Sequence, residues 1–511
     1  MKNILRKTSY LFVISLLFSS CTDLSVGEID SDFYDASSGD LGDPTKNLET
    51  NYNDLGAFTD QANIYSLFEH TSDEMLPPTR GVDWGDNGVW RTLHAHTWDP
   101  AHSYVTESWN QLNGRAFRCN QTIASGGTTQ QTAEARLLRA FYTYHVMDLY
   151  GQVPFREVTQ GPDEDPIVLS RADAFSYIMD DLDAAYADLP VIGPSAGNYQ
   201  VSKAAADYLY AKLYLNKAVY LAANPAGPYT FDNADMQKVI DHVDAIEAAG
   251  YSLDADYFNI FHPTNSASEV ILHSPSGNPA NRIYMTTHYS QNPSGWNGFT
   301  TMADFYNTVA NDPNDQRLGK GPGTTGYVYD AADFPGGNAT GMGYGFLIGQ
   351  QYNDDGTETV DSRTQLPLSF TTDVPLAGAS TEKGIRVMKY HPSVSDFDTR
   401  NYVLMRFGEA YLMRAEAMMR MGAAGALAEV NALRVIRGAT VLAGPLTEAD
   451  MLAERGRELY WEGYRRTDQV RFGTFTDTWS EKTVTDDFRV LYPIPAQALS
   501  TNPNLTQNPG Y

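Results

Sequence analysis

Apolar residues recur with helical spacing in seven separate stretches of this chain, and this pattern constrains its fold more than any other feature. The clearest stretch is TAEARLLRAFYTYHVMDLYG, residues 132–151, which Gly151 ends as helices commonly end. Its apolar face consists of Leu137, Ala140, Phe141, Tyr144 and Met147, at i, i+3, i+4 spacing. The other stretches that we expect to be helical are 170–190, 201–222, 233–251, 401–422, 423–438 and 447–473.

These stretches follow one another closely and carry alanines at close-packing positions, so we expect them to pack as pairs. Helical pairs joined by short turns are typical of tetratricopeptide-like units, although the strict period of about 34 residues is absent here. We count about four pairs, the first formed by 106–124 with 132–150. The predicted fold class is therefore mostly α, with a tetratricopeptide-like helical-pair scaffold.

The character of the chain changes between residues 252 and 400, where Gly, Pro, Asn, Asp, Thr and Tyr dominate. Short apolar runs such as EVILHSPS (269–276) predict a few strands, whereas 319–356 is glycine-rich and has no helical stripe. Loop-rich segments of this length inside a compact protein are usually functional or mobile. We therefore predict a helical scaffold at about 46–251 and 401–473, a loop-rich lobe at about 252–400, and a C-terminal extension at 474–511.

The N-terminus has the pattern of an export signal. Basic residues precede a short apolar run, YLFVISLLF, which is too short to span a bilayer as a helix. Small residues then lead directly to Cys21, so we interpret 1–20 as a lipoprotein signal peptide and 21–45 as a lipidated tether. The alternative is an ordinary signal peptide with an incidental cysteine. The second cysteine, Cys119, lies in a helical pattern and is expected to be a buried free thiol.

A formal charge of −27 argues against nucleic acid and anionic lipid as partners and favours a neutral or polar ligand. Motifs for a nucleophile elbow, a P-loop, a dinucleotide site or a helical zinc site are absent, so we expect no catalytic residue and no metal. His94, His96 and His102 are expected to be structural. Asp and Asn oxygens leave a structural calcium open as the only cofactor, although 353–361 fails the EF-hand spacing. Composition alone does not exclude a glycosidase, because the sequence does not show which two carboxylates lie close enough to act as a catalytic pair.

Several stretches together resemble the SusD/RagB family of outer-membrane lipoproteins, and they cover the chain in order. Besides the N-terminal signal they are SDEMLPPTRGVDWGDNGVWRTLHAHTW (72–98), AEARLLRAFYTYHVMDLYGQVPF (133–155), GWNGFTTMADFYNT (295–308), FLIGQQYNDDG (346–356), RFGEAYLMRAEAMMR (406–420), ERGRELYWEGYRRTDQVRFG (454–473) and LYPIPAQALSTNPNLTQNPGY (491–511).

This resemblance implies a non-catalytic glycan-binding protein, held in the outer membrane by a lipid and facing the cell exterior. It also implies a partner, a TonB-dependent transporter of the SusC type, to which captured oligosaccharide is delivered. A RagB-like lipoprotein that captures peptides is the alternative within the same fold. A surface glycoside hydrolase is the third alternative.

The candidate ligand residues come from two tryptophan-rich stretches. Residues 81–98 hold three of the seven tryptophans. Sugar rings stack on flat aromatic faces, with planar polar side chains around them. The resemblance implies that Trp98, Asp73 and Arg80 contact the ligand. Trp90 is expected to pack in the core, and Trp84 is open between both roles. Trp296 stands between Gly295 and Gly298 and forms a second platform, to which Tyr289 adds an aromatic neighbour. Tyr344, with Tyr327 and Tyr329, is a candidate for a flap over the ligand.

Overall fold

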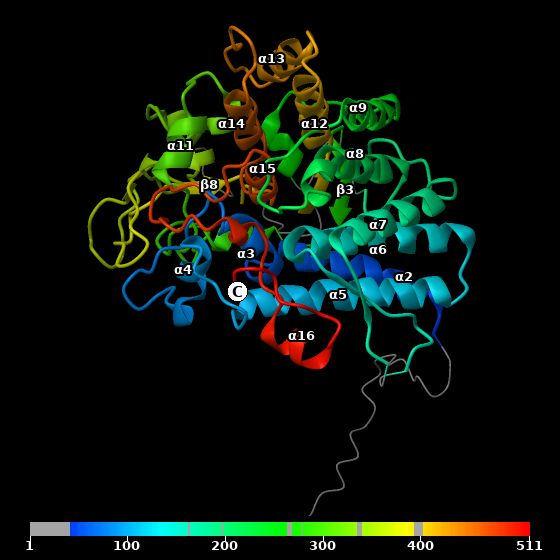
Figure 1. Cartoon of the computed structure of the whole chain (residues 1–511). Helices are drawn as coiled ribbons and strands as arrows, with labels where there is room; N and C mark the ends of the chain where they lie inside the picture. Colours follow the sequence, from blue (N-terminus) through cyan, green and yellow to red (C-terminus); the bar gives the residue numbers. More distant parts are fainter. Residues whose placement is uncertain are drawn as a thin grey trace, which may run out of the picture. The chain divides into compact units, whose positions relative to one another are not determined.

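The computed structural model describes residues 41–161, 164–195, 198–262, 268–277, 279–334, 340–392 and 402–511. Residues 43–511 form one compact unit (Figure 1). The predicted signal peptide, Cys21 and most of the predicted tether lie outside the described residues. The α-helices are α2 (Pro44–Asn53), α3 (Asn63–Glu69), α4 (Val89–His94), α5 (Ser103–Ala124), α6 (Thr129–Tyr150), α7 (Arg171–Tyr186), α8 (Lys203–Tyr220), α9 (Asn233–Ala248), α10 (Ala280–Tyr284), α11 (Ala303–Val309), α12 (Phe407–Arg420), α13 (Ala426–Ile436), α14 (Glu448–Leu459), α15 (Arg465–Arg471) and α16 (Ala496–Thr501).

Short 3-10 turns and short strands complete the described elements. The turns are η1 (Asp54–Thr59), η2 (Asp86–Gly88), η3 (Tyr257–Phe261), η4 (Gln316–Leu318), η5 (Ala331–Asp333) and η6 (Asp487–Val490). The strands are β1 (Val153–Phe155), β2 (Ile167–Leu169), β3 (Val270–Ser274), β4 (Gly319–Lys320), β5 (Tyr344–Leu347), β6 (Gly349–Gln350), β7 (Ser369–Phe370), β8 (Arg386–Met388) and β9 (Tyr402–Arg406). All strand pairs are antiparallel, in the orders β1-β2, β3-β9, β4-β5-β8 and β6-β7.

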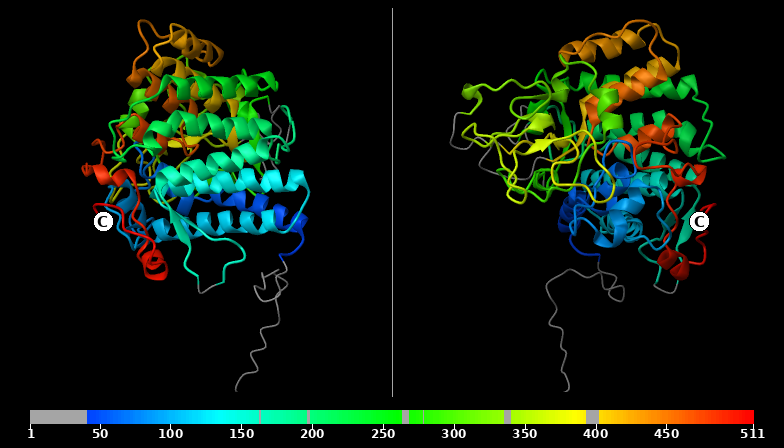
Figure 2. Two further views of the ribbon diagram at one scale, coloured as in Figure 1. Left: turned by 45° about the vertical axis from the view of Figure 1, so that its right-hand side comes forward. Right: turned by 90° about the vertical axis from the view of Figure 1, so that its left-hand side faces the viewer.

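The long helices stack in chain order, as the periodicity predicts. Helix α5 packs on α6, α6 on α7, α7 on α8, and α8 on α9. Helix α12 then continues the stack against α9, although the loop-rich segment separates the two in sequence; Figure 2 shows these layers edge-on. Local chemistry sets the ends: Thr128 and Gln131 form a capping box before α6, and Gly151 ends that helix in the left-handed conformation. The predicted mostly helical fold and the first helical pair are confirmed.

Two predicted helices are wrong at specific points. Residues 402–406 form strand β9, which pairs with β3, so helix α12 begins only at Phe407. The stretch 447–473 is two helices, because the chain turns sharply between α14 and α15. Trp461 and Gly463 both take positive φ there, at 61° and 86°. A bulky residue with positive φ is costly, so tertiary contacts must hold this turn. Helical spacing continues through the turn and therefore hides it.

The molecule has two main hydrophobic cores. The larger one lies among the stacked helices and takes in the chain near its C-terminus. The smaller one fills the loop-rich lobe, and it recruits Tyr65, Trp90, Tyr460 and Trp461 from outside residues 252–400. Trp90 is buried in this core, as the sequence predicts. The lobe is therefore built around side chains that the N-terminal and late helical regions supply.

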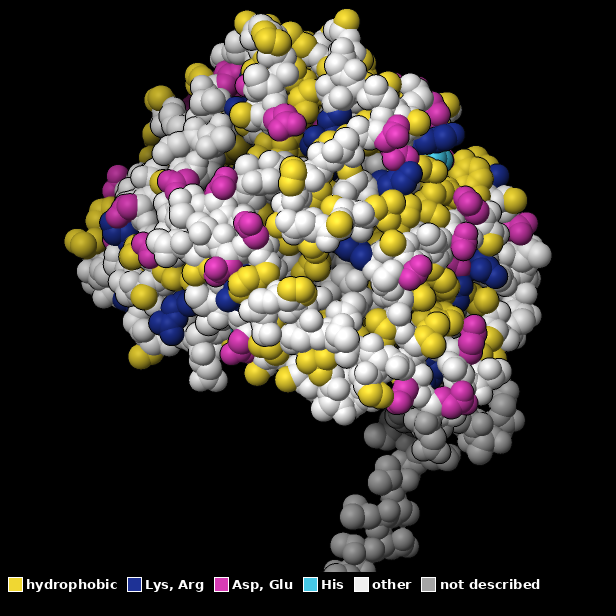
Figure 3. Space-filling view, in the orientation of Figure 1, with side chains coloured by type: hydrophobic (Ala, Val, Ile, Leu, Met, Phe, Trp, Pro, Cys, Tyr) yellow, Lys and Arg dark blue, Asp and Glu magenta, His cyan; other side chains and the backbone are white. Residues whose placement is uncertain are grey.

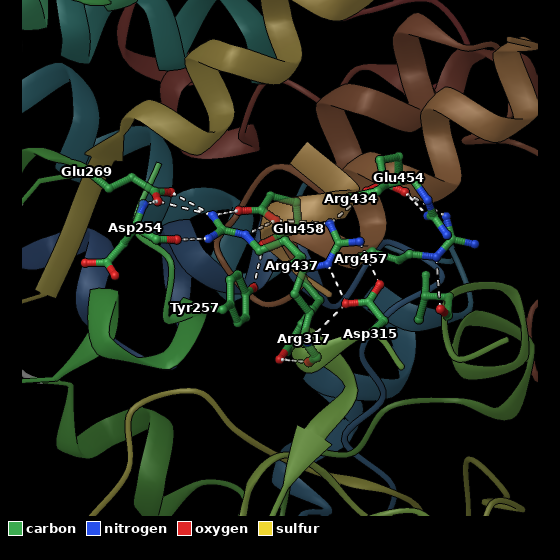
Figure 4. A network of polar contacts seen from close by, with 12 residues as sticks. Asp254, Tyr257, Glu269, Asp315, Arg317, Arg434, Arg437, Glu454, Arg457 and Glu458 are labelled. Carbon is green, nitrogen blue, oxygen red and sulfur yellow. Dashed lines mark hydrogen bonds and ion pairs between the residues drawn. The ribbon is translucent and has the colours of Figure 1, made fainter. Parts of the chain in front are cut away.

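A buried ion network joins α13 and α14 to the lobe. We use this name for Glu269, Asp315, Arg317, Arg406, Arg434, Arg437, Glu454, Arg457 and Glu458. Figure 4 labels all of these except Arg406. Glu458 lies 2.7 Å from Arg437, 2.8 Å from Arg406 and 3.1 Å from Arg317. Burial by itself would raise the pKa of Glu458, but these three guanidinium groups outweigh it and hold the pKa well below its usual range. The network thus fixes the lobe on the helical scaffold.

Candidate aromatic hollow

An open hollow of about 650 Å³ lies where the 80–86 turn meets the 284–298 segment of the lobe. We call it the aromatic hollow. Its residues come from five separate parts of the sequence, so only the tertiary fold assembles it. Its lining residues are Gln61, Val82, Asp83, Trp84, Asp86, Trp90, Tyr104, Met285, Tyr289, Gly295, Trp296 and Arg363.

Trp296 is the most accessible ring of the hollow, with 61% of its surface exposed. Its backbone N–H donates to the Tyr284 carbonyl at 2.7 Å, and the N–H of Asn297 donates to the Thr287 carbonyl at 2.9 Å, so the turn is fixed although the indole is free. A Cβ at Gly295 would overlap Thr287. The glycine beside the tryptophan is thus a steric requirement of the turn.

Trp84 stands beside Trp296 and is partly buried. Its indole N–H donates to the Trp296 carbonyl at 2.9 Å, and its ring lies 5.7 Å from Trp90 and 5.5 Å from Phe299. The Trp84 ring lies directly over Gly298, where any Cβ would overlap it. Trp84 also has φ of 61°, a strained conformation of the kind that clusters at functional sites. Trp84 therefore both packs and contributes to the hollow.

Tyr289 and Arg363 form the opposite part of the lining. The Arg363 guanidinium lies 4.1 Å from the centre of the Tyr289 ring and donates to Asp83 at 2.9 Å. The Tyr289 hydroxyl donates to Asp361 at 3.2 Å, and its ring also contacts His288. Partial burial raises the pKa of Tyr289, so it remains a neutral phenol at physiological pH. Tyr289 joins Trp296 in the hollow, but its ring is partly covered by its own neighbours.

Arg80 holds the Trp296 turn from behind, so the expectation that Arg80 reads a ligand is corrected. It is 4% exposed, and its guanidinium donates to the carbonyls of Asn297 and Lys383, each at 2.7 Å. Arg386 supports the same turn through the Asn297 side-chain oxygen at 2.6 Å. Burial lowers the pKa of Arg80 to about 10, which leaves it charged at neutral pH. Arg80 positions the platform without reaching the hollow.

Trp98 and Asp73 lie elsewhere and do not face the hollow. Trp98 is 1% exposed and donates to the Tyr511 hydroxyl at 2.7 Å, so this indole ties the C-terminus to the core. Asp73 accepts two hydrogen bonds from Arg465, at 2.6 and 2.7 Å. This bidentate pair fixes the Asp73 carboxylate on Arg465, and Asp73 is not among the residues that line the hollow. The expectation that both contact a ligand is corrected by this burial and pairing.

Tyr344 lies on strand β5, where its ring stacks on His391 with centres 3.9 Å apart. It does not line the hollow, and neither do Tyr327 and Tyr329. Tyr327 donates to Asp333, and Tyr329 stacks on Phe334. These tyrosines therefore form separate local clusters in the lobe, and the structure does not bring them to the tryptophans.

The three candidate histidines are buried and bonded to backbone carbonyls. His94 contacts the Ser480 carbonyl at 3.0 Å, His96 that of Thr71 at 2.7 Å, and His102 that of Val89 at 3.1 Å. Burial lowers the pKa of each of them. Within the described ranges, no three His, Cys, Asp or Glu side chains gather so that they could hold a metal ion. No helix in the described part of the chain combines the length and apolar composition needed to cross a bilayer.

A second cavity, of about 370 Å³, lies among α5, α6 and α7 near the C-terminal residues Thr501 and Asn502. Its walls are mainly apolar, and they include Phe117, Val153 and Phe155. It offers neither exposed indole rings nor strained backbone. We therefore regard the aromatic hollow as the candidate site, because accessible rings, carboxylates and backbone strain coincide there.

Sequence reasoning missed Arg363, Gln61 and Tyr104 as lining residues. Arg363 occurs in a stretch with no motif, and its partner Asp83 lies 280 positions away in the sequence. No local signal could have linked them. Gly298 offered a partial signal, because glycine on both sides of an exposed tryptophan suggests close backbone approach.

Comparison with known proteins places this arrangement in context. The SusD family model matches residues 268–488 and 474–511. Starch-binding protein SusD of Bacteroides thetaiotaomicron is 26% identical over 477 residues, which cover 84% of this chain and 82% of that protein. A solved laminarin-binding SusD-like protein has a TM-score of 0.68 at 19% identity, covering 92% of this chain and 99% of that chain. Surface glycan-binding protein A from Bacteroides fluxus has a TM-score of 0.66 at 19% identity and the same coverage. These relatives are named as binding proteins rather than enzymes.

Proposed function

Because residues 268–488 and 474–511 match the SusD family model, we propose that this chain is a non-catalytic protein of that family that binds oligosaccharide in the aromatic hollow. One observation carries the proposal. Trp296 holds its indole 61% exposed at the hollow, on a turn that is fixed by backbone hydrogen bonds and two buried arginines. Large exposed aromatic surface on a rigid support is unusual unless a ligand covers it.

The chemistry of the lining suits a sugar. The apolar C–H face of a pyranose can lie on the Trp296 ring, and the exposed part of Trp84 extends this apolar surface. Asp83, Asp86 and Gln61 supply acceptors and donors for hydroxyl groups at the rim. An open hollow with exposed indoles fits a sugar better than the peptide-capture alternative, for which we expect a deep acidic groove without aromatic platforms.

Affinity electrophoresis tests this proposal. Wild type, Trp296→Ala and Tyr329→Ala would be run through gels that contain one of a panel of polysaccharides, starting with starch and laminarin. Tyr329 is a matched control, because it is 50% exposed in the same lobe but does not line the hollow. We expect retardation of wild type and Tyr329→Ala by at least one polysaccharide, and loss of at least about 90% of the affinity in Trp296→Ala, as for a hot-spot aromatic residue.

Two results would contradict the proposal. One is that no polysaccharide of the panel retards the wild type. The other is that Trp296→Ala binds as tightly as the wild type, which would place binding elsewhere. Incubation of the wild type with the retained polysaccharide should release no reducing sugar, whereas a glycoside hydrolase would release it.

We further propose that the protein is anchored by a lipid on Cys21 at the cell surface and delivers its glycan to a SusC-like TonB-dependent outer-membrane transporter. The sequence pattern before Cys21 and the match to the SusD family model support this proposal. Radiolabelled palmitate should enter the wild type but not Cys21→Ser. Affinity purification of the full chain from its native membrane should recover a large β-barrel protein, and recovery of none would contradict the proposed partner.

A further inference from the structure

The charged groups of the aromatic hollow are few. Among its lining residues the charged side chains are Asp83, Asp86 and Arg363, two carboxylates against one guanidinium. Asp86 accepts the indole N–H of Trp90 at 2.6 Å, a neutral donor that does not cancel its charge. The lining therefore carries a net charge of −1 at neutral pH.

Arg363 is already committed to partners within the protein. It donates to Asp83 at 2.9 Å, and its guanidinium covers the Tyr289 ring at 4.1 Å. An anionic ligand group that bound the remaining N–H groups of Arg363 would lie next to the Asp83 carboxylate, and the two negative charges would repel each other. Arginine binds carboxylate and sulfate well only when its fork of N–H groups is available.

Two arginines close to the hollow are not available to a ligand. Arg80 and Arg386 lie behind the Trp296 turn, 4% and 0% exposed, and their bonds go to protein carbonyls and to Asn297. Two further carboxylates lie close by: Asp361 accepts the Tyr289 hydroxyl, and Asp60 adjoins the lining residue Gln61. On the face drawn in Figure 3, carboxylates are scattered rather than gathered in one patch.

We propose that the hollow accepts uncharged saccharides and discriminates against saccharides that carry carboxylate or sulfate groups, with the Asp83–Arg363 pair as the determinant. This inference rests on the proposed glycan-binding function. Asp83 acts twice, because it adds negative charge to the rim and bonds Arg363, the one arginine among the described lining residues. Like charges brought together at an interface lower affinity and suppress wrong ligands.

The test uses one neutral polysaccharide that the wild type binds and the same polymer with part of its primary hydroxyls oxidised to carboxylates. Binding of both forms is measured by calorimetry at low and high salt. We expect the wild type to bind the neutral form about tenfold or more tightly than the oxidised form at low salt, equivalent to about 1.4 kcal/mol. The difference in affinity between the neutral and the oxidised polymer should narrow at high salt, because salt screens charge repulsion but does not relieve a steric mismatch.

Asp83→Asn is the decisive variant, and Asp256→Asn is its matched control. Asp256 forms a similar exposed pair with Lys320 at 3.1 Å in the same lobe, outside the hollow. We expect Asp83→Asn to narrow the difference in affinity between the two polymers by about threefold or more, since it removes one negative charge and leaves Arg363 with only a neutral amide oxygen as its partner. Asp256→Asn should leave this difference unchanged.

Equal binding of the two polymers by the wild type would overturn the inference, as would an unchanged difference in affinity in Asp83→Asn. Either result leaves the proposed glycan binding intact as long as the neutral polymer binds through Trp296. Failure of the proposed function has a different signature, namely that the neutral polymer is not bound or that Trp296→Ala binds it normally.

Discussion

The buried ion network and the rim of the aromatic hollow use the same residue types at nearly the same distances, but in opposite surroundings. Glu458 lies 2.7 Å from Arg437 with both side chains fully buried. Asp83 lies 2.9 Å from Arg363 with the side chains 42% and 55% exposed. Glu458 faces three guanidinium groups, whereas Asp83 faces one. Burial and the number of partners, rather than distance, therefore separate a structural ion pair from one that a ligand can meet.

This difference also explains the fate of the predicted ligand residues. Asp73 and Arg80 have the side-chain chemistry of sugar-binding residues, but the fold encloses Arg80 and pairs Asp73 with Arg465. Asp83 and Arg363 remain at the surface. Two kinds of variant test this comparison. One removes a charge from the buried ion network, and the other disturbs the rigid support of the hollow.

The largest effect is expected from Glu458→Gln. This change removes a fully buried negative charge that offsets Arg437, Arg406 and Arg317, so these guanidinium groups lose part of their compensation. Breaking a buried ion pair on one side costs about 3–5 kcal/mol of unfolding free energy. Chemical denaturation at neutral pH measures this loss of unfolding free energy.

Glu448→Gln is the control, because Glu448 starts the same helix α14 but is 68% exposed beside Arg420. It should change the unfolding free energy by less than about 1 kcal/mol. Similar losses for the two variants would mean that burial does not separate structural from exposed pairs in this molecule.

A second prediction concerns acid. Burial lowers the pKa of His94, His273 and His391 to about 4 from the ordinary value of 6.5. The unfolded chain therefore binds more protons than the native state between about pH 6.5 and 4, so stability is full above pH 6.5 and falls as the pH drops toward 4. His273 is the best test, because both ring nitrogens lack a hydrogen-bond partner among the described residues.

Replacing His273 with Leu should remove its share of this acid sensitivity, about 2–3 kcal/mol between pH 7 and pH 4 at about 1.4 kcal/mol per pKa unit. Denaturation of both proteins at several pH values measures the difference. At pH 7 the variant should be as stable as the wild type, since the native histidine is neutral there. An unchanged pH slope would show that His273 does not titrate abnormally.

The sequence predicted the scaffold well because helical periodicity is a local property. Helix α6 begins and ends near its predicted limits, since its caps, Thr128 and Gly151, directly flank it in the sequence. Periodicity failed where a tertiary contact sets the backbone conformation. At Trp461, for example, the backbone N–H donates to Glu74, almost four hundred residues away in the sequence.

The candidate site was predictable only in part, for a related reason. Trp296 carried a local signal in its flanking glycines, and it stands exposed as expected. Trp98 had equally suggestive neighbours, but Tyr511 and Tyr492 at the other end of the chain bury it. Arg363 carried no signal, because only the fold brings it to Asp83.

The smallest effect is expected from Gly298→Ala, a variant that tests the support of the hollow. A methyl group at this position would overlap the Trp84 ring, so either the ring or the 295–298 turn must move. Overpacking of this kind costs about 1–3 kcal/mol of unfolding free energy. The indole N–H of Trp84 donates to the Trp296 carbonyl, so a displaced Trp84 ring also shifts Trp296. We therefore expect glycan in the affinity gels to retard this variant less than the wild type.

Gly161→Ala is the control, because a Cβ at Gly161 meets no atom within 4 Å. It should change neither stability nor retardation by a measurable amount. If Gly298→Ala lost stability but bound glycan normally, Trp84 would serve only the core, and Trp296 would act without the neighbouring indole. If it lost both together, the two tryptophans form one rigid platform, because a single methyl group placed under one ring has then disturbed the ligand contact of the other.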